Sequence, residues 1–165
     1  MKNKKVVAMD IETDALEATK IWCICTQDIS TGETNQFLNV DRIPEERDRF
    51  IEYCSTISNF VFHNGIGFDV GIINRLVKEN CVPLDLVLDT LVLSRLIEYN
   101  LEGGHSLKVW GKRLGDFKIG FDDFSCLTQE MIDYCHQDVV VTVKLYKKFL
   151  GVVEDKSWQD AIRCE

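Results

Sequence analysis

Three short stretches of this chain hold side chains whose types and spacing could perform chemistry. The stretch MDIETDAL contains Asp10 and Glu12, HNGIGFD contains Asp69, and YCHQD contains Tyr134 and Asp138. Carboxylates can bind metal ions or transfer protons, and a phenol can orient a reacting molecule by hydrogen bonding. Which of these roles is open to each residue depends on the helix or strand that carries it.

Asp10 and Glu12 lie two residues apart at the end of a predicted strand, so both side chains point to one face. Two neighbouring carboxylates repel each other, and burying them without a cation is costly or forces one of them to bind a proton. A divalent cation removes this conflict, and hard oxygen ligands suit Mg²⁺ or Mn²⁺. The alternative is that both residues and Asp14 form a solvated loop, which is slightly favoured when Asp-x-Glu is considered alone.

Asp69 follows a short apolar run and begins a predicted helix. A carboxylate in that position can interact with the dipole of the helix, which is the simpler alternative to a role in a functional site. Gly65 and Gly67 would allow the backbone to approach a ligand closely. We expect His63 to have only a structural role.

The stretch YCHQD lies on the last predicted helix. Tyr134 and Asp138 are separated by four residues and therefore share a face of that helix. His136 is two residues from Asp138, and on a helix this spacing turns the two side chains toward different faces. Cys135 is nearer to the shared face but is more simply a small buried residue. A tyrosine and an aspartate at this spacing are weak evidence on their own.

The order of predicted elements indicates an α/β protein with a mixed sheet whose first three strands are antiparallel. Apolar patterning and turn residues predict three strands in a meander, followed by helices and strands in alternation and a closing helix. The strands are expected at residues 5–12, 21–26, 33–40 and 59–64, with an extended segment at 84–89. The helices are expected at residues 44–57, 69–80, 90–99, 106–115 and 128–150.

Composition is that of an ordinary soluble globular domain. The 165 residues are 45% hydrophobic and 28% charged, and no segment resembles a linker, a repeat, a signal peptide or a membrane span. We expect one domain at residues 1–150, a C-terminal tail at residues 151–165, and a cytoplasmic location in a bacterium or a phage-infected cell. The net charge of −8 argues against a broad surface for binding duplex DNA.

The seven cysteines predict neither a disulfide framework nor a four-ligand zinc site, because they are scattered and lack suitable spacing. Cys23 and Cys25 alternate as residues of a strand do. We expect both to be small buried side chains.

Taken together and in this order, the three stretches resemble the motifs of the DEDD family of 3′→5′ exonucleases, in its tyrosine-bearing subgroup. The similarity covers nearly the whole chain and is strong to the proofreading domains of family A DNA polymerases from short-tailed bacteriophages. The stretches FHNGIGFDV, DTLVLSRLIEYNL, HSLKVWGKRLG and YCHQDVVVTVKL carry it. The resemblance implies the RNase H-like fold of DnaQ-like exonucleases.

The resemblance also implies a role for each residue of the motifs. Asp10, Glu12, Asp69 and Asp138 would be metal ligands, with Asp10 bridging two Mg²⁺ or Mn²⁺ ions. Glu12 and Asp138 would complete the site of the ion that carries the attacking water, and Asp69 would serve the second ion. Tyr134 would position the water, and the product would be a 5′-mononucleotide.

The third motif separates the two subgroups of this family. In the histidine-bearing subgroup the histidine lies five residues before the last aspartate. That position is Asp133 here, so His136 does not correspond to it. The similarity is therefore to the tyrosine-bearing subgroup.

Four residues are expected to bind the 3′ end of the substrate by the same resemblance. Thr13 would bind the terminal nucleotide, and Leu16 would wedge between the last two bases. Asn64 and Phe68 would line the groove for the strand, with loop hydrogen bonding and core packing as an equally supported alternative.

Other polar residues have simpler interpretations. Asp14 follows the first motif without being a ligand, and Asp89 is expected to cap a helix. His105 and Lys112 could contact phosphate, but a core-packing helix with a solvated basic face is the favoured interpretation.

Four functions remain to be compared. A single-stranded DNA 3′ end is the favoured substrate, because the detailed resemblance is to the proofreading domains of DNA polymerases. Bound cations would supply the positive charge that the protein lacks. A 3′→5′ exoribonuclease of the same fold is the first alternative, since nothing in the motifs recognises a 2′-hydroxyl. An inactive module that docks a DNA polymerase is the second, and an unrelated metal-dependent hydrolase is remote.

Two features depart from the polymerase pattern. No polymerase sequence follows residue 150, so the chain could be a free-standing exonuclease, a subunit of a split polymerase or a piece of a longer protein. Residues 99–104 form a shorter segment than is usual in the viral polymerases. That segment could influence substrate choice or discrimination against duplexes.

Overall fold

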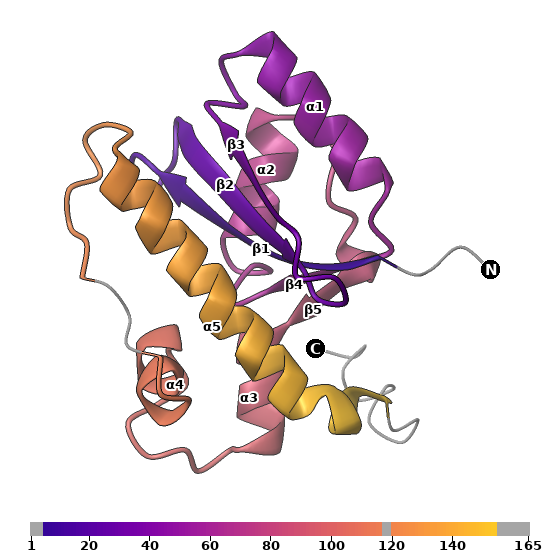
Figure 1. The fold of residues 1–165 in the computed structure, drawn as a ribbon, viewed down its shortest axis with the longest axis vertical. Coiled ribbons are helices and arrows are strands. Elements are labelled where there is room, and N and C mark those ends of the chain that lie inside the picture. Colours follow the sequence, from indigo (N-terminus) through magenta and orange to yellow (C-terminus); the bar gives the residue numbers. More distant parts are fainter. Residues whose placement is uncertain (1–4, 117–119, 155–165) are drawn as a thin grey trace.

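A five-stranded mixed sheet forms the centre of the computed structural model, which describes residues 5–116 and 120–154 (Figure 1). The strand order is β3-β2-β1-β4-β5, in which β1, β2 and β3 are antiparallel and β1, β4 and β5 are parallel. The bounds are β1 Val6–Thr13, β2 Ile21–Asp28, β3 Thr34–Leu38, β4 Asn59–Phe62 and β5 Val87–Asp89. The predicted fold class and the antiparallel first strands are confirmed.

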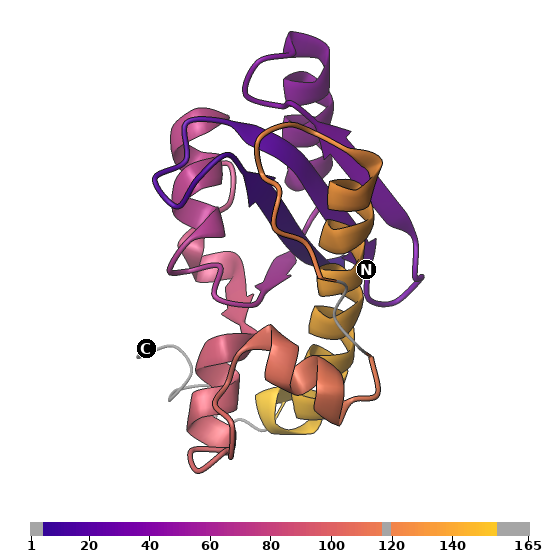
Figure 2. The same ribbon diagram turned by 90° about the vertical axis from the view of Figure 1, so that its left-hand side faces the viewer.

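Helices cover both faces of this sheet (Figure 1). Two helices, α1 and α2, lie on one face, and the long helix α5 crosses the other. Two short helices, α3 and α4, lie beyond the sheet beside the C-terminal half of α5 (Figure 2). The bounds are α1 Pro44–Ser55, α2 Asp69–Leu76, α3 Thr90–Ile97, α4 Leu107–Arg113 and α5 Gln129–Glu154.

Strand alternation in β1 decides which side chains face α5. Val7, Met9 and Ile11 belong to the core cluster on the α1 and α2 side, whereas Ala8 belongs to the cluster under α5. Asp10 and Glu12 have the same parity as Ala8, so they point to the face that α5 covers. The pairing of β1 with β2 becomes irregular between Glu12 and Thr13, directly after the acid pair.

Capping residues set where several helices begin. Pro44 is the first residue of α1, and Ser106 accepts a hydrogen bond from the backbone N–H of Val109 at the start of α4. Asp89 accepts one from the N–H of Leu91 at the start of α3, which confirms the predicted cap. Gly115 has a φ of +76° just beyond α4, where a left-handed residue ends the helix.

Several predicted boundaries are wrong. Residues 84–89 are not extended throughout, because Leu84–Leu86 form a 3₁₀-helix before β5 begins. Helix α2 ends at Leu76 rather than residue 80, since the Asn74 side chain exchanges two hydrogen bonds with the backbone of Val82 and draws the chain back.

The remaining helices also differ in length from the prediction. Helices α1, α3 and α4 end at Ser55, Ile97 and Arg113, each two residues early. Helix α5 continues to Glu154, so it crosses the predicted domain boundary at residue 150. The rest of the predicted tail, residues 155–165, lies outside the described residues. None of the helices in the described part of the chain has the length and hydropathy that crossing a bilayer requires.

Candidate functional site

The acid pair at the end of β1 faces α5. Glu12 is 7% exposed and Asp10 is half-buried. A carboxylate oxygen of each residue and the sulfur of Cys135 on α5 all lie within 4.8 Å of one another. The Cys135 thiol also donates a hydrogen bond to the main-chain oxygen of Asp10, at 3.4 Å. The end of β1 and the first turns of α5 are therefore in direct contact at this point.

Asp69 joins the same region from the opposite face. It is the first residue of α2, it is buried, and its Oδ1 accepts a hydrogen bond of 3.3 Å from the N–H of Ile11, which lies between Asp10 and Glu12. The start of α2 is thus held against the end of β1.

The pKa of Asp69 shows how unfavourable its charge is here. Burial, together with the carboxylates of Asp89 and Asp138, raises this pKa to about 7 against the lowering effect of the backbone hydrogen bonds. Asp138 is itself buried on α5, one turn beyond Cys135. Four carboxylates from β1, α2 and α5 therefore meet at one place, which a divalent cation would stabilise.

Tyr134 is held by two aromatic rings of the segment that precedes α5. Its ring lies 5.6 Å from that of Phe121 and 6.5 Å from that of Phe124, measured between centroids. The carbonyl of Phe124 accepts a hydrogen bond of 3.0 Å from the indole N–H of Trp22 on β2. Sequence reasoning missed these three residues, and the only available signal was the Phe-x-x-Phe spacing in FDDF.

Asp89 does more than cap α3. One of its oxygens accepts a hydrogen bond from the N–H of Asn64 at 2.9 Å, and the other accepts one from the N–H of Ile66 at 3.0 Å. Asn64 has a φ of +65°, a conformation that asparagine tolerates better than most residues. Asp89 therefore fixes the loop that leads into Asp69, a role that sequence reasoning did not find.

Replacing Asp89 with alanine should destabilise the protein by about 2–3 kcal/mol, because it removes a helix cap and the acceptor of two loop N–H groups. The matched control is Ser106→Ala, which removes only the cap of α4 and should cost about 1 kcal/mol or less. Urea unfolding followed by circular dichroism measures both losses. Equal losses in the two variants would show that the loop does not depend on Asp89.

Packing within the loop requires both glycines of the second motif. A Cβ on Gly65 would lie 2.3 Å from the Cβ of Phe62, and one on Gly67 would lie 2.7 Å from Oδ1 of Asn64. Both glycines therefore allow the loop to fold tightly on itself. The chain's own packing accounts for a glycine at each position, and the approach of the backbone to a ligand stays a prediction.

The predicted substrate-binding residues occupy different environments. Leu16 is 88% exposed in the loop after β1, whereas the hydroxyl of buried Thr13 donates to the carbonyl of Ala15 at 2.9 Å. Asn64 is exposed, and Phe68 is half-buried against the core. The structure brings Thr13 and Leu16 to the loop after the acid pair and Asn64 and Phe68 to the loop before Asp69.

Asp14 organises its own loop, in agreement with the sequence-based interpretation. Its carboxylate accepts hydrogen bonds from the backbone N–H groups of Thr19 and Lys20 and from the hydroxyl of Thr19. Its slight burial would raise the pKa, but these hydrogen bonds outweigh that effect and lower the pKa to about 2.

The three histidines have partners outside the carboxylate site. His136 Nε2 lies 3.3 Å from Oε1 of Gln36 on β3. His63 Nδ1 lies 2.9 Å from the Thr90 hydroxyl, and His105 Nδ1 lies 2.7 Å from the Ser94 hydroxyl. The structural interpretations of His63 and His105 agree with these contacts. Lys112 is exposed on α4, a helix that packs through its buried Trp110.

Comparison with known proteins gives a consistent result at the level of sequence. A family model described as 3′-5′ exonuclease matches residues 1–154. The DNA-directed DNA polymerases of Escherichia phage T7 and Enterobacteria phage T3 are 33% and 32% identical to this chain over 188 residues. These matches cover 88% of this chain and 27% of each polymerase, so the chain spans about a quarter of the length of the curated relatives that it matches.

Solved structures show the same fold. Brucella melitensis NrnC has a TM-score of 0.70 at 20% identity, covering 99% of this chain and 81% of that one. The Aedes aegypti Nibbler EXO domain has a TM-score of 0.71 at 12% identity, covering 98% of this chain and 87% of that one. At identities this low the likeness shows the fold alone. The shared fold confirms the RNase H-like architecture that the sequence predicted.

Proposed function

Because this chain belongs to the 3′-5′ exonuclease family, we propose that it hydrolyses single-stranded DNA from the 3′ end and releases 5′-mononucleotides. The observation that carries this proposal is the meeting of Asp10, Glu12, Asp69 and Asp138 at the end of β1. Four carboxylates are far more negative charge than a buried site tolerates alone. The arrangement is therefore suited to holding cations against a phosphate.

The donor set fits Mg²⁺ or Mn²⁺, because it consists of carboxylate oxygens and these are hard ligands. Asp10, Glu12, Asp69 and Asp138 would hold two such ions. When bound, they would lower the pKa of a water molecule and stabilise the charge on the leaving 3′ oxygen. The structure of Brucella NrnC with bound Mg²⁺ shares the fold at a TM-score of 0.66.

Tyr134 would orient the attacking water. Free tyrosine has a pKa of about 10, so a phenol is suited to hydrogen bonding rather than to acting as a base at neutral pH. Phe121 and Phe124 hold the ring from the preceding segment, which restricts the direction of the phenol. Orientation of this kind raises the rate by reducing the entropy lost in the reaction.

The 3′ end of the substrate would lie between the loops on either side of the carboxylates. Thr13 and Leu16 would contact the terminal nucleotide, and Leu16 is available because it is 88% exposed. Asn64 and Phe68 would line the path of the strand. A wedge or stack against a base contributes about 1–3 kcal/mol, which is sufficient to select an unpaired end.

The resemblance to the phage polymerases favours DNA over RNA, because this chain is identical to them at about a third of the aligned positions. The alternative is a 3′→5′ exoribonuclease, for which the fold likeness to NrnC bound to pGG is the relevant observation. A polymerase partner is a further proposal, because this chain matches only 27% of the length of each polymerase.

A time course on 3′-labelled and 5′-labelled oligonucleotides of DNA and RNA tests this proposal. With Mg²⁺, we expect 5′-labelled DNA to shorten one nucleotide at a time and 3′-labelled DNA to release its label at once. EDTA should stop both reactions. Faster shortening of RNA than of DNA would select the exoribonuclease, and no shortening of either would indicate an inactive module.

Replacing Tyr134 with phenylalanine should lower the exonuclease rate roughly five- to tenfold, because a hydrogen bond worth about 1 kcal/mol in the transition state is lost. The affinity for Mg²⁺ should change little. Single-turnover rates and Mg²⁺ titrations measure the two effects. The control is His136→Ala on the same helix, which should retain nearly full activity, and a large loss there would overturn the assignment of Tyr134.

A further inference from the structure

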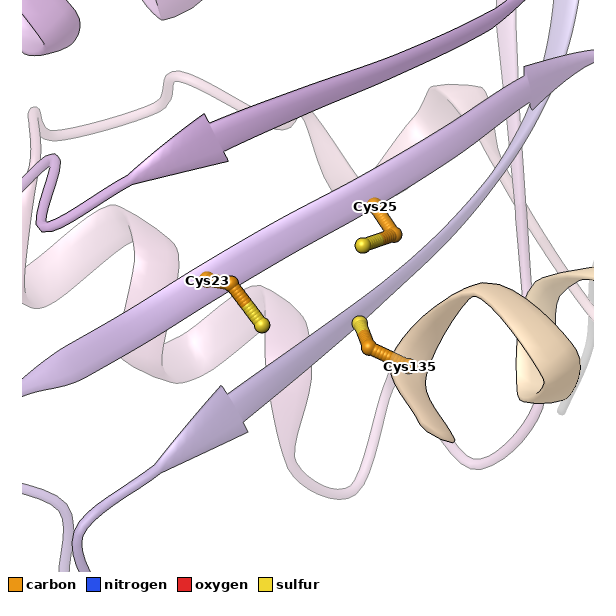
Figure 3. Close-up of side chains that lie close together, drawn as sticks. All are labelled: Cys23, Cys25 and Cys135. Atoms are coloured by element: carbon orange, nitrogen blue, oxygen red, sulfur yellow. The ribbon is translucent and has the colours of Figure 1, made fainter. Parts of the chain in front are cut away.

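Three cysteine side chains from β2 and α5 converge between these two elements (Figure 3). Cys23 and Cys25 lie two residues apart on β2 and share a face, and Cys135 approaches them from α5. Their three sulfur atoms all lie within 4.8 Å of one another, and each side chain is fully buried. The sulfur atoms of the three side chains are turned toward one another (Figure 3).

We propose that Cys23, Cys25 and Cys135 bind one thiophilic cation, with Zn²⁺ as the physiological class and Cd²⁺ as a probe. Three thiolates at the Zn–S distance of about 2.3 Å lie roughly 4 Å from one another around a single ion. The observed sulfur positions therefore need only small side-chain rotations to reach that arrangement.

The chemistry of the ligands separates this site from the neighbouring carboxylates. Thiolates select soft or borderline cations such as Zn²⁺, Cd²⁺ and Cu⁺, whereas carboxylates suit Mg²⁺ and Mn²⁺. One chain would thus hold two classes of cation at neighbouring positions on the α5 side of the sheet. The thiol site would not compete for the Mg²⁺ that the proposed reaction uses.

Two main-chain oxygens lie beside the thiols. Cys135 donates to the carbonyl of Asp10 at 3.4 Å, and Cys25 donates to the carbonyl of Ile132 at 3.8 Å. Binding a cation requires the thiols to lose their protons, so both hydrogen bonds would be replaced by bonds to the metal. Cation binding at the thiol site would therefore free the main-chain oxygen of Asp10 from its hydrogen bond with Cys135.

A simpler role as small core residues accounts for the burial but not for the convergence. The surrounding cluster is apolar and includes Ala8, Val61 and Val139, so alanine or valine would pack there as well as cysteine does. Replacement by valine therefore separates the two roles, because it preserves packing and removes a ligand.

A competing cation position shares Cys135. A carboxylate oxygen from each of Asp10 and Glu12 lies within the same 4.8 Å of the Cys135 sulfur. A cation held there would depend on Asp10 and would not depend on Cys23. The two positions are therefore distinguished by substitution on opposite sides of Cys135.

Titration with Cd²⁺ in excess Mg²⁺ tests the site without reference to catalysis. We expect one Cd²⁺ per wild-type chain by equilibrium dialysis, with the ultraviolet charge-transfer band of Cd²⁺–thiolate bonds. Cys23→Val and Cys25→Val should each weaken binding by more than about a hundredfold. Cys126→Ala, at an exposed cysteine, and Asp10→Asn should bind as wild type does.

The same titration can overturn the proposal. No charge-transfer band in the folded wild-type protein, or a band that persists in both valine variants, would contradict the site. Loss of the band in Asp10→Asn with retention in Cys23→Val would place the cation in the competing position. Circular dichroism verifies each fold, and Cys23→Ala or Cys25→Ala replaces a valine variant that does not fold.

Alkylation provides an independent readout on the wild-type chain. Bound Cd²⁺ should protect Cys23, Cys25 and Cys135 together from a thiol reagent during partial unfolding, while Cys126 reacts as before. Peptide mass spectrometry identifies the protected cysteines. The site would be refuted if Cd²⁺ left all three of these cysteines as reactive as in its absence.

Discussion

The Asp138→Ala variant should lose Mg²⁺-dependent degradation of labelled single-stranded DNA by about a thousandfold or more. Asp138 is 5% exposed on α5, and its charge acts on Asp69 across the site. Removing it would weaken the hold on a cation whose charge stabilisation contributes several kcal/mol to the transition state, and each 1.4 kcal/mol or so is a factor of ten in rate. Single-turnover gel assays at saturating Mg²⁺ measure the loss.

The matched control is Asp133→Ala on the same helix. Asp133 is exposed and accepts a hydrogen bond of 2.9 Å from the Gln129 side chain, so its loss should leave the rate within about twofold of wild type. It also occupies the position that carries the histidine in the other subgroup. Full activity in Asp138→Ala would remove the metal-ligand assignment, and a large loss in Asp133→Ala would place the catalytic surface elsewhere on α5.

The direction of these side chains could be predicted from the sequence wherever it depends on the periodicity of one strand or one helix. Alternation along β1 put Asp10 and Glu12 on one face, and a spacing of four put Tyr134 and Asp138 on one side of α5. Both rules act within one element and need no knowledge of its neighbours. Ordering the three motifs along the chain then identified the family.

Contacts between distant segments could not be predicted in the same way. Cys135 is 110 or more residues from Cys23 and Cys25, and no spacing rule brings β2 and α5 together. The ring contacts of Tyr134 with Phe121 and Phe124 involve a segment without regular structure, which has no period to read. Their positions follow only once the sheet and α5 are packed.

The hydrogen bonds of Asp89 show a second limit. Its cap of α3 is local and was predicted, but its two bonds to the loop before Asp69 join residues 23 and 25 positions apart. The packing of the two glycines in that loop could not be predicted either. A glycine permits close approach without indicating what approaches, and here the neighbours are Phe62 and Asn64.

The Asp69→Asn variant should be more stable than the wild-type protein when cations are removed at about pH 8. Burial raises the pKa of Asp69 to about 7 in the folded chain, whereas an unfolded aspartate has a pKa of about 3.9. A raised folded pKa contributes stability that is complete below about pH 4 and is lost as the pH rises through about 7. The asparagine carries no charge and avoids that loss, by on the order of 2–4 kcal/mol.

Urea unfolding in EDTA and in Mg²⁺, at about pH 5 and about pH 8, measures this effect. Wild-type protein should gain stability from Mg²⁺ mainly at the higher pH, where its carboxylates are ionised and can bind the cation, and Asp69→Asn should gain much less. Asp14→Asn is the control of opposite sign. The pKa of Asp14 is lowered to about 2, so its charge stabilises the fold above about pH 4 and its loss should destabilise slightly without altering the response to Mg²⁺.

If Asp69→Asn unfolds before wild type in EDTA at the higher pH, the four carboxylates do not repel one another enough to require a cation. The metal site would then lose its main physical argument, because that repulsion is what a bound cation would relieve.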